Sequence, residues 1–479
     1  MKRLCAALLL SACGEPEPVI DCKTLRQVDH DAVAAQGSNI LIIMSDDIGI
    51  DKTRVYDAHP DPAPTPNIDA LACAGVRFNH AYSNPTCSPT RASLMTGRHS
   101  TRTGLGKWIY LVNEDHDLRL SEITLPEMLA DSPVDYATAA IGKWHLVGRQ
   151  RQKHDGDSDP AMHPNLQGFE HYQGALGNPL EASGRLEGER GYTLWERVTN
   201  GVPEQMQTYM STVTTDDALS HLETMPEPWL MYVAFNGAHA PLHVPPKHLH
   251  PTVQAAGISS DIKKFDAMVE ATDAEIGRLV AGIPEDVLAR TTIIYLSDNG
   301  TPAFGTASPW PVSRVKGTLY EGGVNIPLIV TGPLVDAPGR TSDALLHVVD
   351  IFPTLADLAE VPLEDLPVDA IDGVSFLPLL TDAAADPTRE LVFVEKFEPN
   401  GPPPHEYHYR MVTDGEWKLI RYEENETITE ELFYIPSDDW LDGINRIHHV
   451  GARARDTDAY ARLSAAMDEQ IAGLAYVAD

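Results

Sequence analysis

The apolar residues of this chain gather in short unbroken runs. Four such runs occupy residues 39–44, 136–141, 229–235 and 292–296. A continuous apolar run of this length is typical of a strand that is buried on both faces. Segments with helical spacing of apolar residues lie between the runs, at 67–74, 125–130 and 262–280. Strands that alternate with helices predict an α/β fold with a mostly parallel sheet sandwiched by helices.

Polar side chains follow each of the four runs. They comprise Asp46 and Asp47, Lys143 and His145, His239, and Asp298 and Asn299, and all except Asn299 can carry charge or exchange protons. In open α/β sheets, ligands bind at the edge where the strands have their carboxyl ends. We therefore expect these residues to meet at one edge of the sheet.

The pattern changes after about residue 385. Residues 391–395, 409–413 and 417–422 are expected to form antiparallel strands, and residues 459–474 a closing helix. This predicts a main α/β domain over 39–384 and a smaller C-terminal α+β subdomain over 385–479, with a short antiparallel sheet. Residues 147–215 are rich in Gly, Pro and charge, and we expect an irregular insertion there that borders the site.

The N-terminus has the features of an export signal. Residues 1–3 (MKR) are basic and residues 5–10 are apolar. Residues 10–13 (LSAC) resemble the lipobox of bacterial lipoproteins, which is cleaved before a cysteine that becomes lipid-modified. We expect a signal peptide over 1–12, a tether over 13–38, and a periplasmic or outer-membrane location with a lipid anchor on Cys13. An ordinary signal peptide cut near Ala12 is the alternative.

The other cysteines differ in their expected fates. Cys5 would be lost with the signal peptide. Cys22 and Cys73 could pair in an oxidising compartment, although spacing alone does not establish a disulfide. Cys87 has no obvious mate.

The chain is strongly acidic, with 36 Lys and Arg against 70 Asp and Glu and a formal net charge of −34. This charge argues against nucleic acid as a partner. An anionic substrate would also be repelled, so it would need a pocket that is locally positive and partly desolvated.

The acidic residues at the predicted sheet edge indicate a cation site. Asp46, Asp47, Asp298 and Asn299 offer only oxygen ligands, which favour Ca²⁺ or Mg²⁺ over zinc. Three carboxylates brought close together do not all stay ionised without a cation. Taken singly, the Asp46-Asp47 pair also suits a turn with a helix cap, and residues 298–300 suit a tight turn.

Cys87 stands two residues before Pro89 and four before Arg91, at the start of an expected short helix. A thiol there could be a core residue, half of a disulfide, a nucleophile or a site of chemical conversion. Distant segments supply the basic partners that a catalytic site needs, namely Arg91, Lys143 and Lys316 as fixed charge and His145 and His239 as proton carriers.

These motifs resemble those of the type I sulfatases, the formylglycine-dependent family of the alkaline phosphatase superfamily. The resemblance rests on residues 87–91 (CSPTR) followed by 96–98 (TGR), on 142–145 (GKWH) and on 298–300 (DNG), and it covers nearly all the chain from residue 39. It implies that a maturation enzyme oxidises Cys87 to formylglycine and that one Ca²⁺ is bound. The implied Ca²⁺ ligands are Asp46, Asp47, the modified Cys87, Asp298 and Asn299. The other implied sulfate-site residues are Arg91, Lys143, His145, His239 and Lys316.

The resemblance also implies a mechanism for sulfate ester hydrolysis. One hydroxyl of the hydrated aldehyde would attack sulfur, with the ester oxygens neutralised by the cation and lysines. His239 or Lys316 would protonate the departing alcohol, and His145 would then help to expel sulfate. Two alternatives are a phosphonate monoester hydrolase or phosphodiesterase of the same superfamily, and a calcium-dependent glycan-binding lipoprotein without turnover.

The substrate is less constrained by the sequence. The insertion after residue 147, the loop 301–311 and the Pro-rich stretch 399–409 are expected to set specificity. Trp310, His405 and Tyr407 are candidate sugar contacts, with loop packing as the favoured alternative. His171 or Asn178 is a guess for one further polar site residue from the insertion. We expect a sulfated polysaccharide as the substrate class, because the chain is predicted to be an exported lipoprotein.

Overall fold

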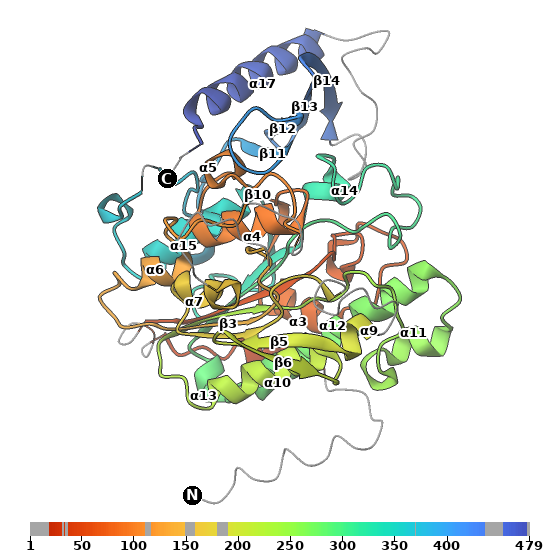
Figure 1. Ribbon diagram of the computed structural model, residues 1–479, viewed down its shortest axis with the longest axis vertical. Coiled ribbons are helices and arrows are strands. Elements are labelled where there is room, and N and C mark those ends of the chain that lie inside the picture. The colour runs from red at the N-terminus through yellow and green to blue at the C-terminus, as the bar shows by residue number, and fades with distance from the viewer. Residues whose placement is uncertain are drawn as a thin grey trace, which may run out of the picture.

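A ten-stranded sheet runs through the molecule, with helices on both faces and a four-stranded sheet at one end (Figure 1). The computed structural model describes residues 19–30, 33, 37–110, 116–148, 159–179, 190–368, 370–435 and 454–476. The predicted signal peptide and the predicted anchor at Cys13 lie outside the described residues. The expected α/β fold with a small antiparallel sheet near the C-terminus is confirmed.

The four apolar runs form the centre of the large sheet. They are the neighbouring parallel strands β8 (Thr291–Ser297), β1 (Asn39–Ser45), β7 (Trp229–Ala234) and β3 (Ala137–Gly142). Every residue of these strands is buried, as an unbroken apolar run requires. Because the four strands are parallel, their carboxyl ends meet at one edge of the sheet.

Shorter strands complete the sheet on both sides. On one side, β9 (Leu328–Thr331) pairs antiparallel with β8 and with β2 (Gly75–Tyr82), and β2 pairs parallel with β10 (Arg340–His347). On the other side, β4 (His171–Gly174) pairs parallel with β3 and then antiparallel with β5 (Trp195–Thr199). The outermost strand is β6 (Val202–Met206), antiparallel to β5.

The expectation of an irregular insertion over 147–215 is therefore wrong in part. This stretch contributes β4, β5 and β6 to the sheet, and the helix α10 (Met210–Leu222) begins within it. Most residues of β6 are exposed, so this edge strand lacks the apolar run that marks the central strands. A short polar edge strand resembles a loop in the sequence, because only its neighbour in the sheet distinguishes the two.

Alternate side chains of β1 pack against helices on opposite faces of the sheet. Ile40, Ile42 and Met44 pack in one core with α4 (Cys87–Thr96), α6 (Leu125–Leu129) and α15 (Ile351–Leu358). Ile43 and Leu41 join another core with α3 (Pro66–Ala74), α10 and α12 (Asp261–Gly282). The two groups of helices lie on opposite sides of the sheet in Figure 1. This division follows from the two-residue period of a strand.

Short helices occupy several of the connections. They are α1 (Cys22–Leu25), α5 (Ser100–Thr103), α7 (His163–Leu166), α9 (Arg190–Thr193), α11 (Pro251–Ala256), α13 (Glu285–Leu288), α14 (Glu321–Val324) and α16 (Leu377–Thr381). Cys22 and Cys73, whose pairing the sequence left open, form a disulfide between α1 and α3. Cys87 is the free cysteine of the described part of the chain, and it is buried.

The second sheet contains β11 (Val392–Glu398), β12 (Tyr407–Thr413), β13 (Trp417–Glu424) and β14 (Thr427–Tyr434) in antiparallel order. The sequence predicted the first three and missed β14. Helix α17 (Ala454–Gly473) packs on this sheet through Leu463 and Met467, which contact a core with Phe393, Val412 and Leu419. Figure 1 shows this unit at the top, beside the end of the large sheet that carries α4 and α5.

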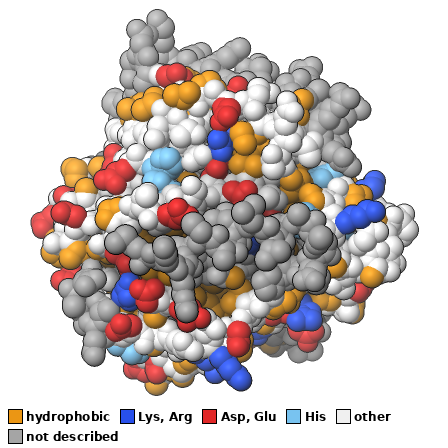
Figure 2. All heavy atoms as spheres, turned by 90° about the horizontal axis from the view of Figure 1, so that it is seen from below, with side chains coloured by type: hydrophobic (Ala, Val, Ile, Leu, Met, Phe, Trp, Pro, Cys, Tyr) orange, Lys and Arg blue, Asp and Glu red, His pale blue; other side chains and the backbone are white. Residues whose placement is uncertain are grey.

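The surface reflects the acidic composition. On the face shown in Figure 2, acidic side chains are spread over much of the described surface, and basic ones form a few small groups. None of the helices in the described ranges is both long enough and apolar enough to cross a membrane.

A buried carboxylate links the second sheet to the main domain. Glu395 of β11 accepts hydrogen bonds from the backbone nitrogen and the hydroxyl of Thr101 in α5, at 2.6 and 2.7 Å. Nε2 of His408 also donates to Glu395, at 2.8 Å. Burial alone would raise the pKa of Glu395, but the hydrogen bond from His408 and the contacts with Thr101 lower it to about 2.

Glu395→Gln should destabilise the protein in a pH-dependent way. The folded pKa of about 2 lies below the ordinary value of 4.5, so ionised Glu395 stabilises the fold fully above about pH 4.5. This stabilisation, on the order of 3 kcal/mol, is lost as the pH falls toward 2. Calorimetric melting midpoints of wild type and variant should differ at pH 7 and should converge as the pH falls from 4.5 toward 2. Glu364→Gln, at an exposed position, is the control and should change little. A pH-independent difference for Glu395→Gln would contradict this account.

Candidate active site

The acidic cluster lies where β1 and β8 end. Ser45 is in register with Ser297, so the residues that follow the two strands are neighbours. The backbone nitrogen of Asp47 donates to Asp298 Oδ1 at 3.2 Å, and Asn299 Nδ2 donates to Asp47 Oδ1 at 2.8 Å. Asp46, Asp47, Asp298 and Asn299 are all buried. The parallel pairing of β1 and β8 thus brings together residues that are about 250 positions apart.

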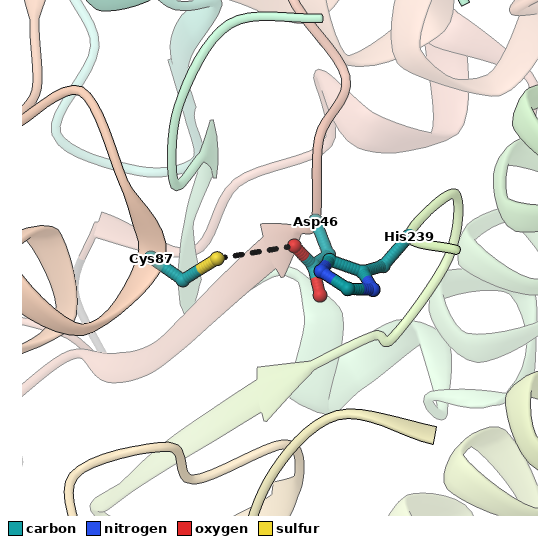
Figure 3. A group of neighbouring side chains, drawn as sticks. All are labelled: Asp46, Cys87 and His239. Atoms are coloured by element: carbon teal, nitrogen blue, oxygen red, sulfur yellow. Dashed lines mark hydrogen bonds between the residues drawn. The ribbon is translucent and has the colours of Figure 1, made fainter. Parts of the chain in front are cut away.

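Cys87 is the first residue of α4 and is only 2% exposed. Figure 3 shows its side chain pointing from α4 toward the carboxylate of Asp46, to which Sγ donates at 3.7 Å. Burial and the nearby Asp298 raise the pKa of the Cys87 thiol to about 12. The thiol is therefore protonated at neutral pH, whereas an activated cysteine nucleophile has a lowered pKa.

Arg91 lies one helical turn after Cys87, on the same face of α4. Its guanidinium is fully buried and donates to Asp298 Oδ2 through Nε at 3.2 Å and Nη2 at 2.8 Å. Nη1 donates to the backbone carbonyl of Lys143 and to the hydroxyl of Tyr232, both at 3.0 Å. Arg91 therefore ties α4 to the ends of β8 and β3 and to the middle of β7.

Two lysines balance the remaining carboxylates. Lys143, directly after β3, is paired with Asp46, and Lys316, in the loop before α14, is paired with Asp47. Lys316 Nζ also lies 3.6 Å from Cys87 Sγ. Burial would raise the pKa of Asp46 and of Asp47, but Lys143 and Lys316 respectively lower each of them below its ordinary value.

Both predicted histidines belong to the cluster. His145 is buried, and its Nε2 donates to the backbone carbonyl of Ile109 at 2.9 Å. Nδ1 is then the acceptor of the neutral ring, and it has no hydrogen-bond partner among the described residues. Burial and the nearby Lys143 and Arg91 hold the pKa of His145 well below its ordinary value. His239 lies beside Asp46 in Figure 3, and its Nδ1 donates to the Ala240 carbonyl at 2.8 Å. Burial lowers the pKa of His239 against the opposing effect of Asp46.

Two backbone conformations also mark the site. Asp47 and His145 adopt left-handed φ values of 67° and 60°. Such values cost energy for residues other than glycine, and they persist where surrounding contacts over-determine them. Both residues lie directly after central strands, in the turns that direct their side chains.

The sequence did not point to the residues that hold this cluster in place. The Tyr192 hydroxyl contacts the backbone carbonyls of Asn236 and His239 at 2.6 and 2.8 Å, and so anchors the loop that carries His239. Tyr232, in the middle of β7, supports Arg91. Neither tyrosine belongs to a recognisable motif, because each acts through its position in the folded chain.

The residues suggested as additional contacts are placed differently. Asn178 follows Gly177, whose carbonyl accepts from Asn236 at 3.3 Å in the His239 loop. His171 instead lies at the amino end of β4, where it stacks on His221 with 4.0 Å between ring centroids. Trp310 is buried and donates to the Ala58 carbonyl, which is loop packing. His405 stacks on Phe397 in the second sheet, and Tyr407 donates to Glu398 there.

The acidic residues fit the cation that the sequence predicts. Ligand atoms of Asp46, Asp47, Cys87 and Asp298 all lie within 4.8 Å of one another. Asn299 Oδ1 is buried and accepts no hydrogen bond from the described residues, so it is available as a further ligand. Carboxylate and amide oxygens are the ligands that Ca²⁺ prefers in proteins.

Two family models match this sequence. The model described as Sulfatase matches residues 38–361, and the model described as N-sulphoglucosamine sulphohydrolase, C-terminal, matches residues 315–452. The first match covers more than half of the chain and contains every residue of the cluster.

Known relatives agree with this assignment. Arylsulfatase J of Mus musculus is 29% identical over 342 residues, which are 70% of this chain and 54% of the relative. The chain thus spans about half the length of that relative. Arylsulfatase A of Homo sapiens is 30% identical over 392 residues, 76% of this chain and 71% of the relative.

A solved structure shares the fold. BT4656, solved in complex with its substrate D-glucosamine-2-N,6-O-disulfate, is similar with a TM-score of 0.70 at 20% identity, over 90% of this chain and 97% of that chain. The matched family model and the arylsulfatase relatives show that the chain belongs to the sulfatase family.

Proposed function

We propose that this chain hydrolyses sulfate esters of carbohydrates at the cluster around Cys87. The observation that carries the proposal is one buried group in which Cys87 lies between Asp46 and Lys316, 3.7 and 3.6 Å from their side chains. Around it stand three carboxylates and three fixed cations, which is the charge arrangement that an anionic ester and a divalent cation require together.

The proposal includes two groups that the chain would acquire. Formylglycine at residue 87 supplies a nucleophilic hydroxyl through hydration of its aldehyde, and its formation needs a maturation enzyme. Ca²⁺ supplies Lewis-acid stabilisation of negative charge on the ester, and Asp46, Asp47, Asp298 and Asn299 would hold it together with residue 87.

The chain's own side chains would bind the ester and move protons. Lys143 and Lys316 provide ammonium groups for the sulfate oxygens, and Arg91 positions Asp298. His145 and His239 each donate a hydrogen bond from one ring nitrogen to a backbone carbonyl. The other ring nitrogen can then take up or release a proton. We assign His239 or Lys316 to the leaving alcohol and His145 to the release of sulfate.

A carbohydrate is the proposed carrier of the sulfate. The structural relative BT4656 has a sulfated glucosamine as its substrate. The predicted export signal supports a substrate outside the cell, and the disulfide between Cys22 and Cys73 suits an oxidising compartment. A lipid anchor on Cys13 would then hold the enzyme at a membrane surface.

Cys87→Ala should abolish turnover and leave the fold intact. Removing the residue that supplies the nucleophile should lower the rate of 4-nitrophenyl sulfate hydrolysis by at least about 10³-fold. Mass spectrometry of the wild-type peptide should show an aldehyde in place of the thiol. The control is the double variant Cys22→Ser, Cys73→Ser, which should keep its turnover. Wild-type rates in Cys87→Ala would contradict the proposal, as would faster hydrolysis of a phosphate diester than of a sulfate ester.

Ca²⁺ should stabilise chelator-treated protein and restore its turnover. Binding to the folded state alone stabilises by about 3 kcal/mol when free Ca²⁺ is 100 times its dissociation constant. Asp47→Asn should weaken Ca²⁺ binding in calorimetric titration, because it removes a charged ligand. Asp51→Asn is the matched control, since Asp51 is also buried nearby but accepts from Thr301 and lies outside the ligand set. Equal affinity in both variants would contradict this assignment.

A further inference from the structure

A lysine of the second sheet reaches the edge of the catalytic cluster. Lys396 of β11 donates from Nζ to the backbone carbonyl of Gly317 at 2.8 Å. Gly317 directly follows Lys316, and its own nitrogen donates to the carbonyl of Pro85 at 2.8 Å. Lys396 therefore forms a hydrogen bond at the point where the segment that carries Lys316 contacts the segment that leads to Cys87.

Solvent reaches this side of the cluster. The side chains of Asp46, Arg91 and Lys143 are 0% exposed, whereas the side chain of Lys316 is 16% exposed. A substrate has to approach past exposed groups, so the part of it that is not sulfate lies near Lys316 and the residues around it. Lys396 is half-buried at this position. We call this edge of the site, which comprises Lys107, Lys316, Lys396, Glu398 and Tyr407, the rim.

Lys396 differs from the other lysine at this rim in its charge balance. Lys107 forms an ion pair with Glu398 at 2.7 Å. Within the described residues no carboxylate is close enough to Lys396 for an ion pair, although the chain carries 70 acidic residues. Its other close contact is the ring of Tyr407, with 5.5 Å from Nζ to the centroid. Burial lowers the pKa of Lys396 against the effect of Glu398, as expected for an ammonium that has lost water without gaining a counter-ion.

An aromatic surface lies beside this charge. Tyr407 stacks on Tyr409, with 4.7 Å between centroids, and its hydroxyl donates to Glu398 at 3.0 Å. Carbohydrate sites combine such aromatic faces with a few placed polar groups. The rim thus offers two partly exposed tyrosine rings, a hydrogen-bonding carboxylate and one cation that has no ion pair among the described residues.

We propose that Lys396 binds a second anionic group, a sulfate or a carboxylate, on the sugar that carries the scissile ester. This inference rests on the proposed function and specifies its substrate as a sugar with at least two negative charges. It also explains how a chain with a net charge of −34 can select such a sugar, because the anion meets a partly desolvated cation at the rim.

The test is competition by sulfated sugars against hydrolysis of 4-nitrophenyl sulfate. The inhibitors are N-acetylglucosamine 6-sulfate, with one anion, glucosamine-2-N,6-O-disulfate, with a second sulfate, and glucuronic acid 2-sulfate, with a carboxylate. Lys396→Gln should raise the inhibition constant of the doubly charged sugar about 10-fold to 100-fold relative to that of the singly charged one. A selective effect on the disulfate identifies a second sulfate, and one on the uronate identifies a carboxylate.

Two further variants separate binding from structure. Lys264→Gln makes the same change in net charge at a partly exposed position of α12 and should leave all inhibition constants unchanged. Lys396→Arg should retain most of the selectivity, because it keeps the charge. A Lys396→Gln variant that weakens every inhibitor equally, or none, would overturn the inference. Failure of the wild type to cleave any sulfate ester would instead overturn the proposed function itself.

Discussion

The site depends on burying three carboxylates beside three cations. Asp46, Asp47 and Asp298 are removed from water, and each is held by one partner, Lys143, Lys316 and Arg91 respectively. An unpaired charge at such depth costs several kcal/mol, so removing one member would leave its partner strongly destabilised. The strand ends that supply Asp46, Asp47, Lys143 and Asp298 must therefore stay in register, and α4 and the loop before α14 must hold Arg91 and Lys316 against them.

The same charge balance reconciles an acidic protein with an anionic substrate. The six buried charges sum to zero without a metal, so a bound divalent cation would make the cluster positive. The field of the whole chain, at −34, opposes an incoming anion over distance but is screened by salt. Attraction then has to come from close, desolvated cations, which act where screening is weak.

The second sheet contacts the main domain at two places close to the catalytic cluster. Glu395 fastens β11 to α5, which follows closely after α4. One residue further along β11, Lys396 points to the opposite face of the strand and reaches the Lys316 loop. A single strand thus holds the subdomain in place with one side chain and extends the site with the next.

Much of the site was predictable because its residues stand in short motifs directly after strands. The apolar runs determined the four central strands, and the chemistry of residues 46–47, 87–91, 143–145 and 298–299 determined which side chains belong together. The sequence could not reveal the edge strand β6 or the supports Tyr192 and Tyr232, since their roles depend on contacts with distant backbone. Likewise, only the tertiary structure decided that Lys396 reaches Gly317 in the Lys316 loop, because these residues are 79 positions apart in sequence and only the packing of the two sheets brings them together.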